Sequence, residues 1–130
     1  MSKELIKKYY DHFNKQEFDQ MIACLDKNVV HELNEGDAQE GLEAFKAFMK
    51  VMDDHYSEQV KELLVFQGND NRFAAEFFID GVYKKSQDGL PEANNQKYYI
   101  RVGAFFEVKD QKITRVTNHY NLKNWIEVVN

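Results

Sequence analysis

The spacing of apolar residues changes from a helical to a strand-like period at about Glu58, and this change limits the folds open to the chain. Before Glu58, apolar side chains recur every three or four residues, which predicts amphipathic helices. After it, apolar and polar residues alternate, as they do in half-buried strands. Helices followed by hairpin-connected strands favour an α+β domain in which the helices pack on one face of an antiparallel sheet.

The segment before Glu58 predicts three helices and one short strand. Ser2 is a suitable N-cap residue for the first helix, and the third helix starts after Gly41. The helices are expected at residues 2–16, 18–25 and 42–56, and the strand at 28–33, before the polar residues 34–36.

The segment after Glu58 predicts four strands and a short final helix. A turn at 68–71 joins the first two strands, and Asp110 and Gln111 form a tight hairpin between the last two. A polar loop at 86–95 joins the two long middle strands, and the final helix holds Trp125. The strands are expected at residues 58–67, 72–85, 96–109 and 112–122.

The two longest predicted strands are apolar on both faces. Phe77 and Phe78 are neighbours in one strand, and Phe105 and Phe106 are neighbours in the next. A sheet with one solvated face alternates more cleanly than this. We therefore expect a partner subunit to cover the outer face, so that the chain forms a homodimer.

The composition is that of one domain spanning residues 1–130. A net charge of −5 argues against a nucleic-acid-binding surface, which needs clustered Lys and Arg. No apolar run approaches the length of a membrane span, and the N-terminus enters a helical pattern without a secretory apolar core. Because Cys24 is the only cysteine and cannot form an internal disulfide, we expect a cytoplasmic location.

The sequence offers little for a metal or cofactor. The four histidines are far apart and no Cys cluster is present, so we expect no metal site. The six glycines are scattered and form no phosphate-binding loop, so we expect no cofactor.

Aromatic residues make up 14% of the chain, with 10 Phe, 7 Tyr and one Trp. Tyr combines apolar area with a hydroxyl group that needs a partner when it is buried. This composition suits a cavity lined by rings with a few polar tips, for a small apolar organic ligand. The alternative is that the rings simply fill the core.

Three segments resemble a known family. They are residues 103–122 with the following Trp125, the loop residues Gly89-Leu90-Pro91, and residues 31–36 after the second helix. On these residues the whole chain resembles the nuclear transport factor 2-like superfamily, and within it the ketosteroid isomerase-related, SnoaL-like group. The resemblance implies a cone-shaped barrel, in which a strongly curved, mixed or antiparallel sheet wraps around three N-terminal helices and leaves a pocket. Such domains are commonly dimers through the outer face of the sheet.

The resemblance retains one of the three catalytic positions of ketosteroid isomerase. The phenol that donates a hydrogen bond to the developing enolate matches Tyr9. The proton-transferring aspartate falls on Leu33, and the acid that completes the oxyanion hole falls near Ala104. Since neither Leu nor Ala can perform these roles, we do not expect steroid isomerase activity.

Ionisable residues next to the lost base are the candidates for proton transfer. Val29, His31 and Leu33 share one face of the predicted strand, and His31 can act as an acid or base near neutral pH. If the strand is turned over, Glu32 and Asn34 face the pocket, and Glu32 carries the proton with a pKa raised by desolvation. Both orientations are open, and so is a structural His31 with satisfied ring nitrogens.

The match to the isomerase turns one face of the last strand toward the pocket. Asn118 would then place an amide among apolar walls, where it either binds a ligand or braces the sheet. Tyr99 and Arg101 are further possible lining residues, and a solvated or subunit-facing position is equally open to Arg101. The residues expected to bind a ligand are Asn34, Met52, Tyr56, Phe106, Val116, Asn118 and Tyr120.

Two functional hypotheses follow. The first is a cofactor-free isomerase, cyclase or dehydratase that transfers a proton at a carbon next to a carbonyl group of a small apolar compound. Tyr9 would stabilise oxyanion charge, and His31 or Glu32 would move the proton. The second is a non-catalytic domain of the same fold that binds an apolar metabolite or serves as a dimeric scaffold.

Overall fold

The structure, a computed structural model, describes residues 2–33 and 36–130. Met1, Asn34 and Glu35 lie outside this part, as does the side chain of Ser2 with its expected capping role. The elements are α1 (Ser2–Asn14), α2 (Phe18–Ile22), β1 (Leu25–Leu33), β2 (Gln39–Glu40), α3 (Leu42–His55), β3 (Tyr56–Gln67), β4 (Arg72–Tyr83), β5 (Gln96–Lys109), β6 (Lys112–Tyr120) and α4 (Leu122–Val129).

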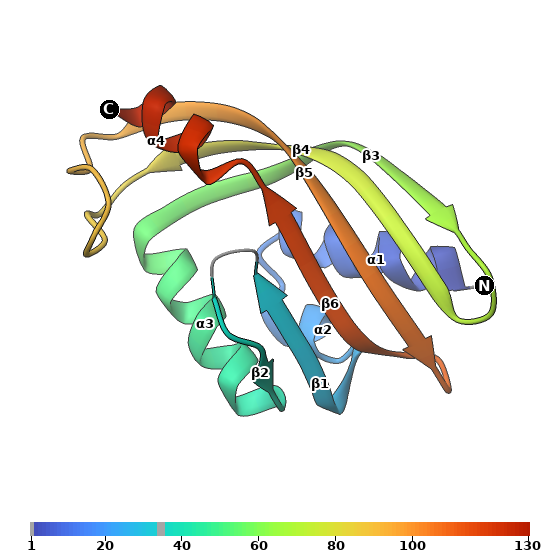
Figure 1. Cartoon of the computed structure of the whole chain (residues 1–130). Coiled ribbons are helices and arrows are strands. Elements are labelled where there is room, and N and C mark those ends of the chain that lie inside the picture. The colour runs from blue at the N-terminus through green and yellow to red at the C-terminus, as the bar shows by residue number, and fades with distance from the viewer. Residues whose placement is uncertain (1, 34–35) are drawn as a thin grey trace.

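The fold is α+β, with six strands in the order β2-β1-β6-β5-β4-β3. The sheet is mixed, because β1 runs parallel to β6 while every other neighbouring pair is antiparallel. It curves strongly without closing into a barrel, and α1, α2 and α3 lie on one side of it (Figure 1). The cone fold implied by the resemblance is confirmed, with a sheet whose two edge strands do not pair with each other.

The curvature has a local cause in three irregularities of strand register. They fall between Leu25 and Val30 in β1, between Lys61 and Leu64 in β3, and between Glu107 and Val108 in β5. The irregularity in β3 includes Glu62 in the left-handed region, at a φ of 56°. Because a bulge bends its strand and increases the local twist, these positions help the sheet to wrap around the helices.

The predicted helices and long strands are confirmed with small shifts at their ends, except that the second helix ends at Ile22 and Leu25, expected in that helix, is the first residue of β1. Asp110 and Gln111 both have positive φ, of 50° and 64°, as a two-residue hairpin turn requires. The last strand ends at Tyr120, because the Asn121 side chain caps α4 by accepting a bond from the Asn124 N–H. The strand β2 was not predicted, since its two residues are polar and exposed.

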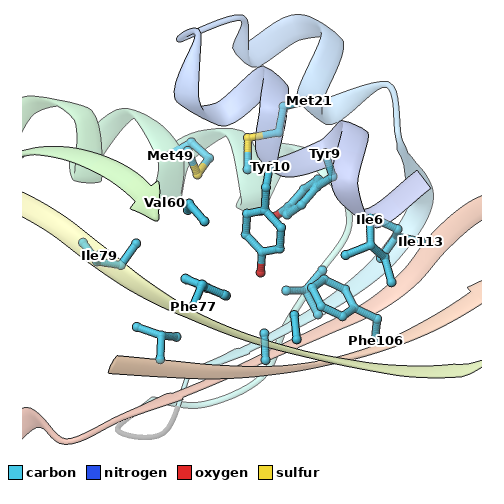
Figure 2. Packing of buried hydrophobic residues seen from close by; sticks show 14 of the residues in the cluster. Ile6, Tyr9, Tyr10, Met21, Met49, Val60, Phe77, Ile79, Phe106 and Ile113 are labelled. Carbon is cyan, nitrogen blue, oxygen red and sulfur yellow. The ribbon is translucent and has the colours of Figure 1, made fainter. Parts of the chain in front are cut away.

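The core lies between the apolar stripes of α1 and α3 and the concave face of the sheet. Side chains of α1 point toward the sheet and meet those of β4 and β5, including Phe77 and Phe106 (Figure 2). Inward and outward side chains alternate regularly along β4 and β5. This alternation assigns each strand residue either to the core side or to the outer face.

The outer face carries several large apolar side chains. Phe66, Tyr99 and Phe105 are 53%, 50% and 46% exposed. The interpretation of Tyr99 as a lining residue is therefore wrong, and of the two positions open to Arg101 the surface position is the one found. Both face outward, where Tyr99 stacks on Phe78 and the Arg101 guanidinium lies 5.0 Å from the centre of the Phe78 ring.

Within residues 2–33 and 36–130, no helix is both long enough and apolar enough to cross a membrane.

Candidate functional site

The helices and the concave face of the sheet enclose a cavity of about 300 Å³. This is at the lower end of the usual range for small-molecule sites. Its walls are mainly aliphatic and aromatic, with contributions from α1, α3, the four long strands, β1 and α4. The side chains that bring polar atoms to these walls are Tyr9, Tyr10, His31, Tyr56, Glu58, Gln87, Asn118, Tyr120 and Trp125.

His31 on β1 faces the cavity and is 4% exposed. Its ring lies edge-on to Phe45 and Phe48 of α3, with centroid distances of 4.9 and 4.7 Å. In the described part of the chain its ring nitrogens form no hydrogen bond, so the satisfied structural histidine is not observed. Burial lowers the pKa of His31 to about 4, because the apolar surroundings disfavour the imidazolium. The imidazole is therefore neutral at physiological pH.

Glu32 points to the opposite face of β1, and the alternative in which it carries the proton inside the cavity is wrong. The strand pairs Glu32 with Thr117 on the outer side of β6. The Thr117 hydroxyl donates to Glu32 Oε1 at 2.6 Å, and Arg115 Nη1 lies 3.8 Å from the same oxygen. Alternation along the strand explains the outcome, since a residue next to an inward His31 must face outward.

Two adjacent phenols of α1 reach the cavity. Tyr9 was expected there, but Tyr10 was not, and their rings meet edge-on at 5.1 Å. Tyr10 is 6% exposed, and its hydroxyl is buried without a hydrogen-bond partner in the described part of the chain. Figure 2 shows this hydroxyl pointing from α1 toward the sheet, and the Tyr10 ring lies 4.8 Å from the Phe77 ring of β4. Burial raises the pKa of both phenols, so each stays a hydrogen-bond donor.

The structure places the other expected ligand-binding residues as follows. Met52, Tyr56, Asn118 and Tyr120 line the cavity. Phe106 and Val116 face the same way but are fully buried core residues that do not reach the wall. Asn34 lies outside the described residues.

Asn118 projects its amide into the cavity from β6, where it pairs with Ala104 and Leu33. Within the described residues its side chain makes no hydrogen bond, so the bracing role considered for it is not observed. An amide among apolar walls is costly to leave unpaired, which makes Asn118 available to a ligand.

Sequence reasoning missed a carboxyl group in the wall. Glu58 of β3 lines the cavity, and the Tyr98 hydroxyl of β5 donates to its Oε2 at 2.5 Å. Burial raises the pKa of Glu58, while the hydrogen bond from Tyr98 acts in the opposite direction. The alternation of β3 did contain a signal, because Tyr56, Glu58 and Val60 share one face.

The loop between β4 and β5 closes one wall through two tyrosines. The Tyr83 hydroxyl donates to the Pro91 carbonyl at 2.6 Å and accepts from the Gln87 N–H at 3.0 Å. The Tyr56 hydroxyl donates to Gln87 Oε1 at 2.5 Å. Trp125 of α4 packs edge-on against Tyr56 and Tyr83, so the loop and α4 are joined to the same aromatic cluster.

Across residues 2–33 and 36–130, no three or more His, Cys, Asp or Glu side chains gather in a way that could hold a metal ion.

Comparison with known proteins identifies similar chains. A family profile described as a SnoaL-like domain matches residues 6–116. A solved protein of Xanthomonas campestris pv. campestris, described as a candidate polyketide cyclase, is 42% identical with a TM-score of 0.95, and the match covers 99% of this chain and 96% of that one. A Pseudomonas putida KT2440 protein with the same description is 41% identical with a TM-score of 0.97, covering 100% and 98%. No protein of curated description matches.

A more distant structure bears on the fold alone. A nuclear transport factor 2-like protein of unknown function from Burkholderia pseudomallei K96243 is 11% identical, with a TM-score of 0.78. The match covers 99% of this chain and 97% of that chain.

Proposed function

The chain belongs to the SnoaL-like family. From this membership we propose that it is an enzyme that transfers a proton at the carbon next to a carbonyl group of a small apolar compound. The reaction class is that of a cofactor-free isomerase, cyclase or dehydratase. The observation that carries the proposal is the presence of a neutral imidazole and two phenol donors in one apolar cavity.

Each polar group has a role in such a reaction. The His31 imidazole removes a proton from the carbon next to the carbonyl group, and the electron pair of the broken C–H bond forms an enolate. The phenols of Tyr9 and Tyr10 donate hydrogen bonds to the enolate oxygen as its charge develops. The same proton is then returned from the imidazolium to carbon in an isomerisation or to the departing oxygen in a dehydration. In a cyclisation the enolate carbon adds to a second carbonyl group, and the proton goes to the alkoxide that this addition forms.

The low pKa of free His31 is compatible with this role. An isolated imidazolium is disfavoured in the cavity by desolvation, but the enolate formed in the same step is its counter-ion. Because the walls are mainly apolar, little water competes for this ion pair.

The similar proteins support the same reaction class. Two proteins at 41–42% identity over nearly the whole chain are described as candidate polyketide cyclases. Cyclisation of a polyketide joins an enolate carbon to a carbonyl group, so it needs the proton transfer proposed here.

The test is hydrogen–deuterium exchange on 2-tetralone, a two-ring ketone with acidic hydrogens next to its carbonyl group. NMR in deuterated buffer should show the protein accelerating the loss of these hydrogens. We expect His31→Gln to slow the exchange by about 10²–10⁴-fold and Tyr9→Phe by about 10²-fold. Glu32→Gln is the matched control, since its side chain faces away from the cavity.

Two results would contradict the proposal. Equal exchange rates for wild type and His31→Gln would show that His31 is not the base. Binding of 2-tetralone with no exchange would favour the alternative function, a non-catalytic domain that carries an apolar metabolite.

We also propose that the chain forms a homodimer through the outer face of the sheet. Strand register aligns Phe66 of β3 with Ala74 of β4 and Phe105 of β5, so the apolar side chains form a continuous row. Glu76 and Arg101 lie on the same face and place both signs of charge beside that row. A face with both signs can pair with a second copy of itself across a two-fold axis.

A further inference from the structure

A second hollow, separate from the cavity, lies where α1 and α2 meet the turn between β5 and β6. Its volume is about 280 Å³, and among the described residues none lines both it and the cavity. The Ile113 N–H of β6 donates to the Cys24 carbonyl at 2.9 Å, and Lys112 Nζ donates to the Ala23 carbonyl at 2.5 Å. These bonds hold the turn against the end of α2, so the walls of the second hollow are fixed relative to one another.

The second hollow carries two positive charges and, in the described part of the chain, no negative one. Lys8 of α1 and Lys112 of β6 line it, and none of its described lining residues is acidic. Lys8 forms no ion pair with a described residue, whereas Glu4 and Asp11 on the same helix pair with other lysines. In a chain with a net charge of −5, the second hollow is therefore a local basic site.

The two ammonium groups act on the same buried side chain. Cys24 is 4% exposed and lines the second hollow. Burial raises the pKa of its thiol, while the charges of Lys8 and Lys112 act in the opposite direction. Because the effect of a charge falls off with distance, two lysines that both act on Cys24 are close enough to act together on one anion.

The other walls suit an anionic group that is attached to a small organic part. Gln20 and Gln111 bring amide groups that can donate to anionic oxygens, and neither amide is hydrogen-bonded within the described residues. Leu5 and Ala23 add apolar surface. The second hollow is almost as large as the cavity, so it has room for an organic part beside the anion.

We propose that the second hollow binds the phosphate group of a small phosphorylated compound between the ammonium groups of Lys8 and Lys112. A phosphate monoester carries a charge of about −1.5 to −2 near pH 7, which matches two lysines better than the single charge of a carboxylate. An ammonium group has three N–H donors, and Lys112 uses one of them on Ala23. The inference is independent of the proposed function, because it concerns other residues.

The test is a titration of the isotope-labelled protein with glycerol 3-phosphate, followed by NMR. The backbone N–H signals of residues 20–24 and 110–113 report binding, and sodium chloride keeps the ionic strength constant so that screening does not change. We expect these signals to shift until they saturate. Inorganic phosphate, titrated in the same way, should bind at the same residues but more weakly, because it lacks the organic part. Acetate should not saturate over the same range of concentration, because it carries a single charge.

Three variants assign the binding to the second hollow. Lys8→Gln should raise the half-saturating concentration of glycerol 3-phosphate about tenfold, because one charged donor is lost. Lys7→Gln is the matched control, since it removes the same charge from the next position of α1 but does not line the second hollow. Ala23→Leu fills the second hollow without a change in charge, and Ala23 is exposed, so the fold should tolerate it. This variant should weaken binding at least as much as Lys8→Gln.

Four results would overturn the inference. They are the absence of saturable shifts with glycerol 3-phosphate, saturation by inorganic phosphate alone, equal binding of acetate, and equal effects of Lys7→Gln and Lys8→Gln. Unchanged binding in Ala23→Leu would also overturn it, because the charges would then act without the second hollow. Exchange on 2-tetralone by Lys8→Gln should match wild type, since Lys8 does not line the cavity.

Discussion

Tyr10 and Tyr83 are both buried, but their hydroxyl groups have opposite surroundings. The Tyr83 hydroxyl donates to Pro91 and accepts from Gln87. The Tyr10 hydroxyl has no partner in the described residues, although Tyr10 is one of the residues that line the cavity. A polar group left unpaired in an apolar site destabilises the unliganded protein, so it is more easily explained by a ligand than by folding.

Tyr10→Phe should therefore stabilise the protein while weakening its function. We expect the free energy of unfolding to rise by about 1 kcal/mol, because the unpaired hydroxyl is removed and the ring is kept. Exchange on 2-tetralone should slow, because one donor to the enolate oxygen is lost. Urea denaturation and the NMR exchange assay measure the two effects.

Tyr83→Phe is the control for that prediction. It breaks two hydrogen bonds and should lower the free energy of unfolding by about 1–3 kcal/mol. A destabilising Tyr10→Phe would contradict the view that its hydroxyl is held for a ligand.

His31 should make the stability of the fold depend on pH in the mildly acidic range. Its pKa is about 4 in the folded protein and about 6.5 in the unfolded chain. Between these values the unfolded chain binds more protons, so stability falls as the pH is lowered from 6.5 toward 4. The loss due to His31 should reach about 3 kcal/mol.

Replacing the imidazole should remove this component of the pH dependence. Urea denaturation gives the free energy of unfolding of wild type and of His31→Leu at pH 7 and at pH 4.5. Wild type should lose more stability between these two pH values than His31→Leu does, and the difference is the contribution of His31. Equal losses in the two proteins would show that His31 is not buried in its neutral form.

At the residue scale, sequence reasoning succeeded where the family resemblance could fix which of the two alternating faces points inward. The inward set of the last strand was predicted from alternation and the isomerase match, and Asn118 and Tyr120 do line the cavity. Sequence reasoning could not decide whether His31 or Glu32 faces the cavity, because the answer depends on which face of β1 meets α3. Glu58 was missed because its partner Tyr98 is 40 residues away in the chain.

At the scale of elements, two side-chain amides join α1 to the edge strand β3. Asn14, the last residue of α1, accepts from the Val60 N–H at 2.7 Å and donates to the Val60 carbonyl at 3.0 Å. The Gln59 amide donates to the Asn14 carbonyl at 2.9 Å. These bonds hold the helix that carries Tyr9 and Tyr10 against the sheet.

Asn14→Ala should lower the free energy of unfolding by about 1–3 kcal/mol, because both Val60 backbone groups lose their partner. Chemical denaturation measures the change. Lys15→Ala next to it removes an exposed ion pair with Asp11 and should leave the free energy of unfolding nearly unchanged. Equal effects of the two variants would show that Asn14 does not hold α1 in place.

Local patterns were enough to predict most elements, and non-local contacts explain the rest. The helices follow from the 3.6-residue period, and the 110–111 hairpin follows from turn geometry. The parallel pairing of β1 with β6 joins segments more than 80 residues apart, and no local pattern encodes it. The bulges that curve the sheet are also set by the pairing of strands rather than by one strand alone.

At the scale of the whole molecule, the outer face of the sheet should hold two copies together. We expect sedimentation at micromolar concentration to give a mass of two chains, because an interface of standard size is stable in this range. Phe105→Glu should convert the protein to a monomer, since it places a charge in the apolar row.

Val51→Glu is the control for the dimer prediction. Val51 is 43% exposed, almost as much as Phe105, but it lies on α3, away from the outer face of the sheet. This variant should remain a dimer. A monomeric wild type would contradict the prediction, and so would dissociation of both variants.

A crystal structure of the protein with 2-tetralone bound tests the central claim most directly. The account predicts electron density for the ketone inside the cavity, with its oxygen within hydrogen-bond distance of the Tyr9 or Tyr10 hydroxyl and its acidic carbon facing the His31 ring. Density only on the outer surface would contradict it, and so would a ketone in the cavity whose oxygen contacts neither phenol.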